Sequence, residues 1–226
     1  MNLFVWDLHG VLEQGNERVV VDISNAALQR AGFKQHFTYV DGCRLYGLKW
    51  YEYFQWLLPN EDSVVHLRLQ EECVRIATTR PDMYRKWMRP TPNAHDVLAK
   101  IDDSQHDQIL ISNTRSHSLN MFMRMLKLGG YFSQEVTQET AFPVDQRVNV
   151  LWRTKKDVLS TYLYARAQEQ ELYRKIIIIG DSPNDMKLVD VAGGITYLYA
   201  HPGFPFRSCA SDYKINDLKH VLKYAD

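Results

Sequence analysis

Short, fully apolar runs constrain the fold of this chain more than any other feature of its 226 residues. Three of them are Leu3–Trp6, Ile109–Ile111 and Ile176–Ile179, and Ile195–Tyr199 is a fourth, mostly apolar run; stretches of mixed character separate them. Runs this short, without polar alternation and bounded by turn-forming residues, are typical of strands buried on both faces of a parallel sheet. The chain is therefore predicted to build its core around such a sheet.

Helical patterns lie between these runs. They cover residues 94–101, 116–128, 154–167 and 185–191. Strands that alternate with helices predict an α/β fold with a doubly wound, Rossmann-like parallel sheet.

Residues 17–89 do not follow this alternation. They are rich in large aromatic side chains, and their pattern is mostly helical. The stretch Arg89-Pro90-Thr91-Pro92 then predicts a rigid return into the α/β part. We therefore expect an α/β core domain of residues 1–16 and 90–226 with a helical domain of residues 17–89 inserted after the first strand. An insert of this size needs its aromatics mainly for a core of its own.

Charge and cysteine usage narrow the function classes. Lys and Arg together number 27, as do Asp and Glu, so the formal net charge is zero and gives no general attraction to nucleic acid or to an acidic membrane. The three cysteines form no C-x-x-C pair. The opening residues lack the pattern of a secretory signal, and no apolar run is long enough to span a bilayer. We expect a cytoplasmic protein without nucleic-acid or membrane partners; the sequence does not indicate its oligomeric state.

Polar groups follow three of the predicted strands, where a doubly wound sheet binds its ligands. Any one of them alone would be an ordinary helix cap or turn. The groups that occur in order along the chain are Asp7 with His9, Ser112 with Asn113 and Thr114, Lys155 with Lys156 at a helix start, and Asp181 with Asp185. Four such groups in succession indicate one site.

These residue types suit phosphoryl transfer. A carboxylate can attack phosphorus and form an acyl phosphate that water hydrolyses. Mg²⁺ prefers carboxylate, water and phosphate oxygens, and it offsets the repulsion between a carboxylate and an anionic substrate. A hydroxyl and a lysine can bind the remaining phosphoryl oxygens. The set predicts an Mg²⁺-dependent hydrolase of a small phosphorylated metabolite.

The order of these motifs resembles the haloacid dehalogenase (HAD) superfamily along the whole chain. Asp7-Leu8-His9-Gly10 looks like the first motif, and the strand that ends in Ser112-Asn113 is similar to the second. Lys155 resembles the lysine of the third motif, with Lys156 as a rival, and Gly180-Asp181-Ser182-Pro183-Asn184-Asp185 matches the acidic fourth.

The resemblance implies a role for each matched residue. Asp7 would be the nucleophile and a metal ligand, together with the backbone carbonyl of His9. Ser112 would bind the phosphoryl oxygens, with Asn113 as a further substrate contact, and Lys155 would steady Asp7. Asp181 and Asp185 would complete the Mg²⁺ site. Residues 17–89 would form a cap that closes over the pocket and selects the leaving group.

His9 departs from the family pattern, which usually has a second Asp two residues after the nucleophile. Three interpretations stay open: imidazole replaces the carboxylate as the acid and base, the leaving group needs little protonation, or the protein is slow or inactive. The last would make the chain a phosphate-binding pseudo-enzyme.

Two further classes are weighed against the phosphatase. A dehalogenase- or phosphonatase-like hydrolase is the enzymatic rival, but a dehalogenase has no need of the Asp181 and Asp185 pair. A receiver-type binding module shares the sheet but explains neither the helical insert nor Lys155.

Overall fold

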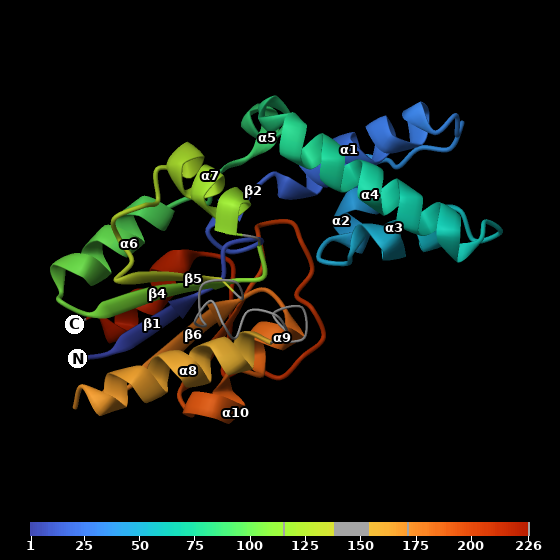
Figure 1. The fold of residues 1–226 in the computed structure, drawn as a ribbon. Coiled ribbons are helices and arrows are strands. Elements are labelled where there is room, and N and C mark those ends of the chain that lie inside the picture. The colour runs from blue at the N-terminus through green and yellow to red at the C-terminus, as the bar shows by residue number, and fades with distance from the viewer. Residues whose placement is uncertain (115, 138–153, 171, 226) are drawn as a thin grey trace. The chain divides into compact units, whose positions relative to one another are not determined.

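The computed structural model describes residues 1–114, 116–137, 154–170 and 172–225, and the chain divides into two compact units (Figure 1). One unit consists of Met1–Glu13 and Pro90–Asp226, and the other of Gln14–Arg89. The chain passes between them through β2 (Glu13–Gln14) and β3 (Arg89–Pro90), which pair as a two-stranded sheet. The helical unit begins at Gln14 rather than at residue 17, because helix α1 already starts at Asn16.

A parallel sheet forms the centre of the first unit and has six strands in the described part of the chain. Their order is β5-β4-β1-β6-β7-β8. The strands are β1 (Leu3–Trp6), β4 (Asp107–Ser112), β5 (Gln134–Thr137), β6 (Ile176–Gly180), β7 (Ile195–Tyr199) and β8 (Tyr213–Ile215). The α/β fold with a parallel Rossmann-like sheet is thus confirmed.

Strand β1 is the central strand that positions the candidate site. Its four residues are buried, and they pair in parallel with β4 on one side and β6 on the other. Trp6 lies opposite Leu110 and Ile179, so the carboxyl ends of β1, β4 and β6 lie at the same edge of the sheet. The loops after β1, β4 and β6 therefore emerge together.

Helices cover both faces of this sheet (Figure 1). Helices α6 (Ala94–Asp103) and α7 (Ser116–Leu126) lie on one side, and α8 (Lys155–Gln168) and α10 (Val189–Ala192) on the other. Leu3 and Val5 of β1 pack in one buried cluster with Val158 and Leu159 of α8. Successive strand residues point to opposite faces, so both faces of β1 need apolar side chains. The 3₁₀ helix Leu218–Tyr224 packs against α6.

The second unit is helical. It contains α1 (Asn16–Arg30), α2 (Tyr39–Leu45), α3 (Trp50–Leu57), α4 (Ser63–Thr79) and α5 (Pro81–Trp87). Phe37, Tyr53 and Phe54 are buried with their rings in contact, while Trp56 is partly exposed. Tyr84 is buried as well, so four of the large aromatics of this unit lie in its core and the others are partly or largely exposed.

Several elements differ from the sequence expectations. The four predicted strands are present, but the sheet also contains β5 and β8, whose sequences lack an apolar run. The helix expected over residues 185–191 is wrong. The chain instead forms α9 (Pro183–Met186) and α10, because Ser182 and Asp185 cap each other in a single tight turn. Among the described residues, no helix has the length and apolar character that crossing a membrane requires.

Candidate active site

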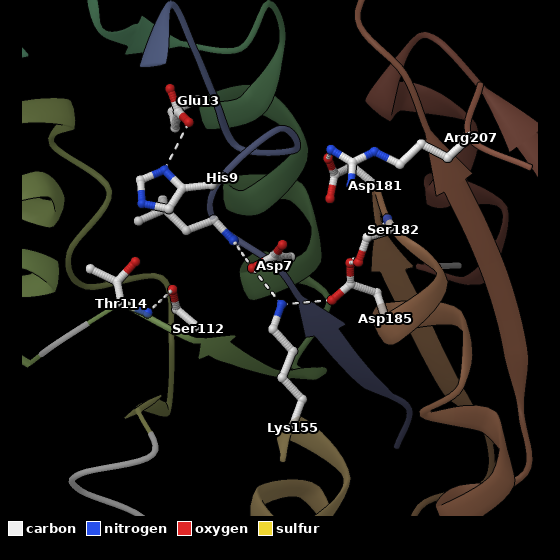
Figure 2. Close-up of polar contacts among 11 residues, drawn as sticks. Asp7, His9, Glu13, Ser112, Thr114, Lys155, Asp181, Ser182, Asp185 and Arg207 are labelled. Atoms are coloured by element: carbon white, nitrogen blue, oxygen red, sulfur yellow. Dashed lines mark hydrogen bonds and ion pairs between the residues drawn. The ribbon is translucent and has the colours of Figure 1, made fainter. Parts of the chain in front are cut away.

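Asp7 follows the last residue of β1 and lies at the centre of the site (Figure 2). Its backbone amide donates to the carbonyl of Ile179 at 3.0 Å, which extends the pairing of β1 with β6 by one residue. The amide of Leu8 donates to Asp7 Oδ1 at 2.8 Å and fixes the side chain. The carboxylate is held on a rigid strand end, which suits a residue that must meet a reacting atom.

Lys155 joins two carboxylates of the site. Its Nζ lies 2.7 Å from Asp7 Oδ1 and 2.6 Å from Asp185 Oδ1, and its side chain is only 6% exposed. Lys155 is the first residue of α8, where Thr154 and Asp157 form a reciprocal capping box that fixes the start of the helix.

Lys156, the alternative to Lys155 for the lysine of the third motif, does not contact the acidic residues of the site. Its ammonium forms an exposed ion pair with Asp190. Of the two neighbouring lysines, the structure brings only Lys155 to Asp7 and Asp185.

Asp7, Asp181 and Asp185 form an acidic cluster beyond the ends of β1 and β6. Each offers a carboxylate oxygen, and these oxygens all lie within 4.8 Å of one another. Asp185 is buried and accepts hydrogen bonds from both the amide and the hydroxyl of Ser182. Three hard oxygen donors at this spacing match the preference of Mg²⁺.

Two glycines allow this close approach. A Cβ at Gly180 would meet Asp185 Cβ at 2.1 Å, and a Cβ at Gly10 would meet Asp181 Oδ2 at 2.6 Å. Gly10 also has a φ of +77°, which disfavours other residues. The absence of side chains here lets Asp181 lie against the backbone of the loop after β1 and Asp185 against the backbone of β6.

Repulsion among the three carboxylates of the cluster favours the binding of a cation. Burial raises the pKa of Asp181 to about 7, and the charge of Asp7 adds to the shift. Burial also raises the pKa of Asp7, against the opposing effect of Lys155. For Lys155, burial lowers the pKa, but the charges of Asp185 and Asp7 outweigh it and hold the pKa above its usual value. A divalent cation among these oxygens would remove the carboxylate repulsion.

Arg207 already supplies part of that charge. Its guanidinium lies 3.1 Å from Asp181 Oδ2 (Figure 2). The residue belongs to the loop after β7 and was not predicted from the sequence, because 25 residues separate it from Asp181 and no spacing connects the two.

Ser112 ends β4 and is buried. Its Oγ accepts a hydrogen bond from the amide of Thr114 at 3.1 Å (Figure 2), so the hydroxyl hydrogen is not used in this contact. Asn113 is exposed in the same loop. Arg115, which follows this motif, lies outside the described residues.

His9 points to a partner that sequence reasoning missed. His9 Nδ1 lies 2.9 Å from Oε1 of Glu13, whose side chain is completely buried. Burial lowers the pKa of His9, but the hydrogen bond and the charge of Glu13 outweigh it, so the pKa lies above its ordinary value. The four-residue spacing between the two was the signal that could have indicated the pair.

The sheet order and the acidic cluster at the end of its central strand define a Rossmann-like α/β protein with a site suited to a divalent cation. The model of the haloacid dehalogenase-like hydrolase family matches residues 4–196, so the chain belongs to this family. The family resemblance seen in the sequence is thereby confirmed. No curated protein matches the sequence.

Solved structures share the fold across the whole chain. A predicted phosphoglycolate phosphatase from Haemophilus somnus has a TM-score of 0.72 and 14% identity, covering 99% of this chain and 97% of its own. A HAD-superfamily hydrolase of subfamily IA from Geobacter sulfurreducens has a TM-score of 0.69 and 17% identity over 100% and 97%. A predicted phosphatase from Clostridium acetobutylicum has a TM-score of 0.69 and 15% identity over 98% and 96%.

Proposed function

We propose that this protein is an Mg²⁺-dependent phosphatase that hydrolyses a small phosphorylated molecule through an aspartyl-phosphate on Asp7. The observation that carries the proposal is the contact of Lys155 with both Asp7 and Asp185 at the exit of the central strand. A buried carboxylate oriented by a lysine beside two further acids suits nucleophilic attack on a phosphoryl group better than a structural role.

Asp7, Asp181 and Asp185 would hold the metal ion, with the backbone carbonyl of His9 as the ligand that the family resemblance adds. The spacing of the three carboxylates and the raised pKa of Asp181 support this set. A Mg²⁺ ion held by these residues would supply positive charge that offsets the repulsion of the attacking carboxylate by the anionic phosphoryl group.

In the first half of the reaction, a carboxylate oxygen of Asp7 forms a bond to phosphorus while the bond from phosphorus to the leaving oxygen breaks. Lys155 holds Asp7 in the attacking orientation, and the hydroxyl of Ser112 donates to a phosphoryl oxygen, with Asn113 as a further substrate contact. His9 gives a proton to the leaving oxygen.

In the second half, His9 takes a proton from a water molecule as that water attacks the phosphorus. The bond to Asp7 breaks, which releases inorganic phosphate and restores the carboxylate. We assign residues 17–89 the role of a cap that excludes bulk water and selects the leaving group.

The names of similar structures favour a small phosphorylated substrate: those from Haemophilus somnus and Clostridium acetobutylicum are described as predicted phosphatases. The formal net charge of zero is consistent with a small-molecule partner in the cytoplasm rather than with nucleic acid or a membrane.

A phosphate-binding pseudo-enzyme of the same fold is the second candidate, and His9 in place of the usual Asp is the observation that favours it. A dehalogenase-like hydrolase is disfavoured, because three clustered carboxylates would be costly without a cation.

Turnover of p-nitrophenyl phosphate with Mg²⁺ and with a chelator tests the proposal. We expect hydrolysis that stops on chelation and in Asp7→Asn. Binding of a phosphate mimic without any turnover would favour the pseudo-enzyme, and full activity of Asp7→Asn would refute the assigned nucleophile.

A further inference from the structure

The contact between His9 and Glu13 is unusual for a loop next to a candidate nucleophile. The ring nitrogen Nδ1 of His9 lies 2.9 Å from Glu13 Oε1, and the Glu13 side chain has an exposed fraction of 0%. The imidazole side chain itself is 27% exposed. A buried carboxylate therefore contacts one edge of a partly exposed ring (Figure 2).

Two contacts of its backbone hold Glu13 in place, one at its amide and one at its carbonyl. Its amide donates to the carbonyl of Leu8 at 3.3 Å, and its own carbonyl lies 3.0 Å from His201 Nε2. His201 belongs to the Pro- and Gly-containing loop after β7. The carboxylate is thus anchored from two directions, which fixes the place where it can meet His9.

The ring of His9 also contacts an aromatic side chain. The ring of Phe122 from α7 lies with its centroid 5.3 Å away at an interplanar angle of 74°. Together with the contact to Glu13, this packing restricts the orientation of the imidazole.

The chemistry of the pair assigns the proton. A carboxylate oxygen accepts hydrogen bonds, so the contact with Glu13 Oε1 favours the tautomer in which Nδ1 carries the hydrogen and donates it. In the neutral imidazole, Nε2 is then the basic nitrogen. Within the described residues, no hydrogen bond occupies Nε2.

We propose that Glu13 is a positioning residue that orients the ring of His9 and keeps its proton on Nδ1. Its consequence for turnover rests on the phosphatase proposed above, while the orientation of the ring does not.

The first test observes the ring directly in the intact protein. Nitrogen NMR of ¹⁵N-histidine-labelled protein at alkaline pH distinguishes a protonated Nδ1 from a protonated Nε2. We expect His9 to carry its proton on Nδ1 in the wild type and to lose this preference in Glu13→Ala. Asp212→Asn removes a carboxylate that precedes β8 in the same unit and accepts hydrogen bonds from Thr196 of β7, and it should leave the signal unchanged. A proton on Nε2 in the wild type would overturn the proposal whether or not the protein has activity.

The second test uses kinetics. Glu13→Ala should lower kcat by about 10²-fold or more with little change in KM, because acid–base assistance is typically worth 10²–10⁴-fold. Glu13→Gln keeps a hydrogen-bond acceptor, so it should fold and lose less activity than Glu13→Ala. Equal changes in kcat and KM, or equal losses in the two variants, would assign Glu13 a structural role only.

A wild type without turnover but with a proton on Nδ1 would refute the phosphatase and support the role of Glu13.

Discussion

Replacement of Lys155 by methionine tests how the acidic site is held together. Methionine keeps most of the apolar stem but removes the ammonium between Asp7 and Asp185. Removal of one partner from a buried ion pair typically costs about 3–5 kcal/mol, because it leaves an uncompensated buried charge. For a chain of this length, that loss lowers Tm by roughly 6–20 °C.

Calorimetric unfolding of the metal-free protein measures this loss, and Lys156→Met is the matched control. Lys156 is the next residue, but its ion pair with Asp190 is exposed, so its loss should cost about 0–1 kcal/mol. We expect a large drop in Tm for Lys155→Met and almost none for Lys156→Met.

Added Mg²⁺ separates a lost charge from lost packing. Without the ammonium, the three carboxylates carry more unbalanced negative charge, so the variant should bind Mg²⁺ more tightly than the wild type does. Tenfold tighter binding corresponds to about 1.4 kcal/mol, and saturating Mg²⁺ should narrow the gap in unfolding free energy by at least that amount. Equal losses in the two lysine variants, or a gap that Mg²⁺ leaves unchanged, would refute the reasoning.

Three further substitutions probe the surroundings of the site. Gly180→Ala should weaken Mg²⁺ binding at least tenfold by calorimetric titration, because its Cβ would displace Asp185; unchanged affinity would contradict this. Arg207→Gln should tighten Mg²⁺ binding in the same assay, since its guanidinium pairs with Asp181, and weaker binding would count against such competition. Hydrogen bonds from the amide and hydroxyl of a β7 threonine lower the pKa of Asp212, so they stabilise the fold above the ordinary carboxyl pKa and are lost as pH falls through the depressed value. Asp212→Asn should therefore lower Tm near neutral pH and match the wild type in strong acid; a gap independent of pH would disprove the linkage.

The strands that carry the site were predictable because they are buried on both faces. Ile109–Ile111 and Ile176–Ile179 contain no polar position that a helix or an edge strand would need. β5 and β8 are the outermost strands of the described sheet, and such strands need no continuous apolar run. Their sequences therefore gave no signal above that of a loop.

Asp7 and Asp181 directly follow β1 and β6, and Asp185 lies in the turn after β6. The convergence of these three acids could therefore be expected from the order of the motifs. Arg207 and Glu13 could not be expected in the same way. Arg207 reaches Asp181 from a loop far along the chain, and the bond between Glu13 and His9 depends on how one turn folds back on itself. Such contacts depend on backbone geometry that residue types alone do not encode.

The central place of β1 has a consequence for biosynthesis. Leu3–Trp6 is made early, but its two neighbours in the sheet begin at Asp107 and Ile176. At about 5–20 residues per second, β6 follows roughly 10–30 s later. The helical segment from Gln14 to Arg89 is continuous in sequence, so it can pack its own core during that interval. The apolar strand β1 has neither of its partner strands while this segment is made. The pairing of β1 with both of its neighbours can therefore be complete only after Ile176–Gly180 has left the ribosome.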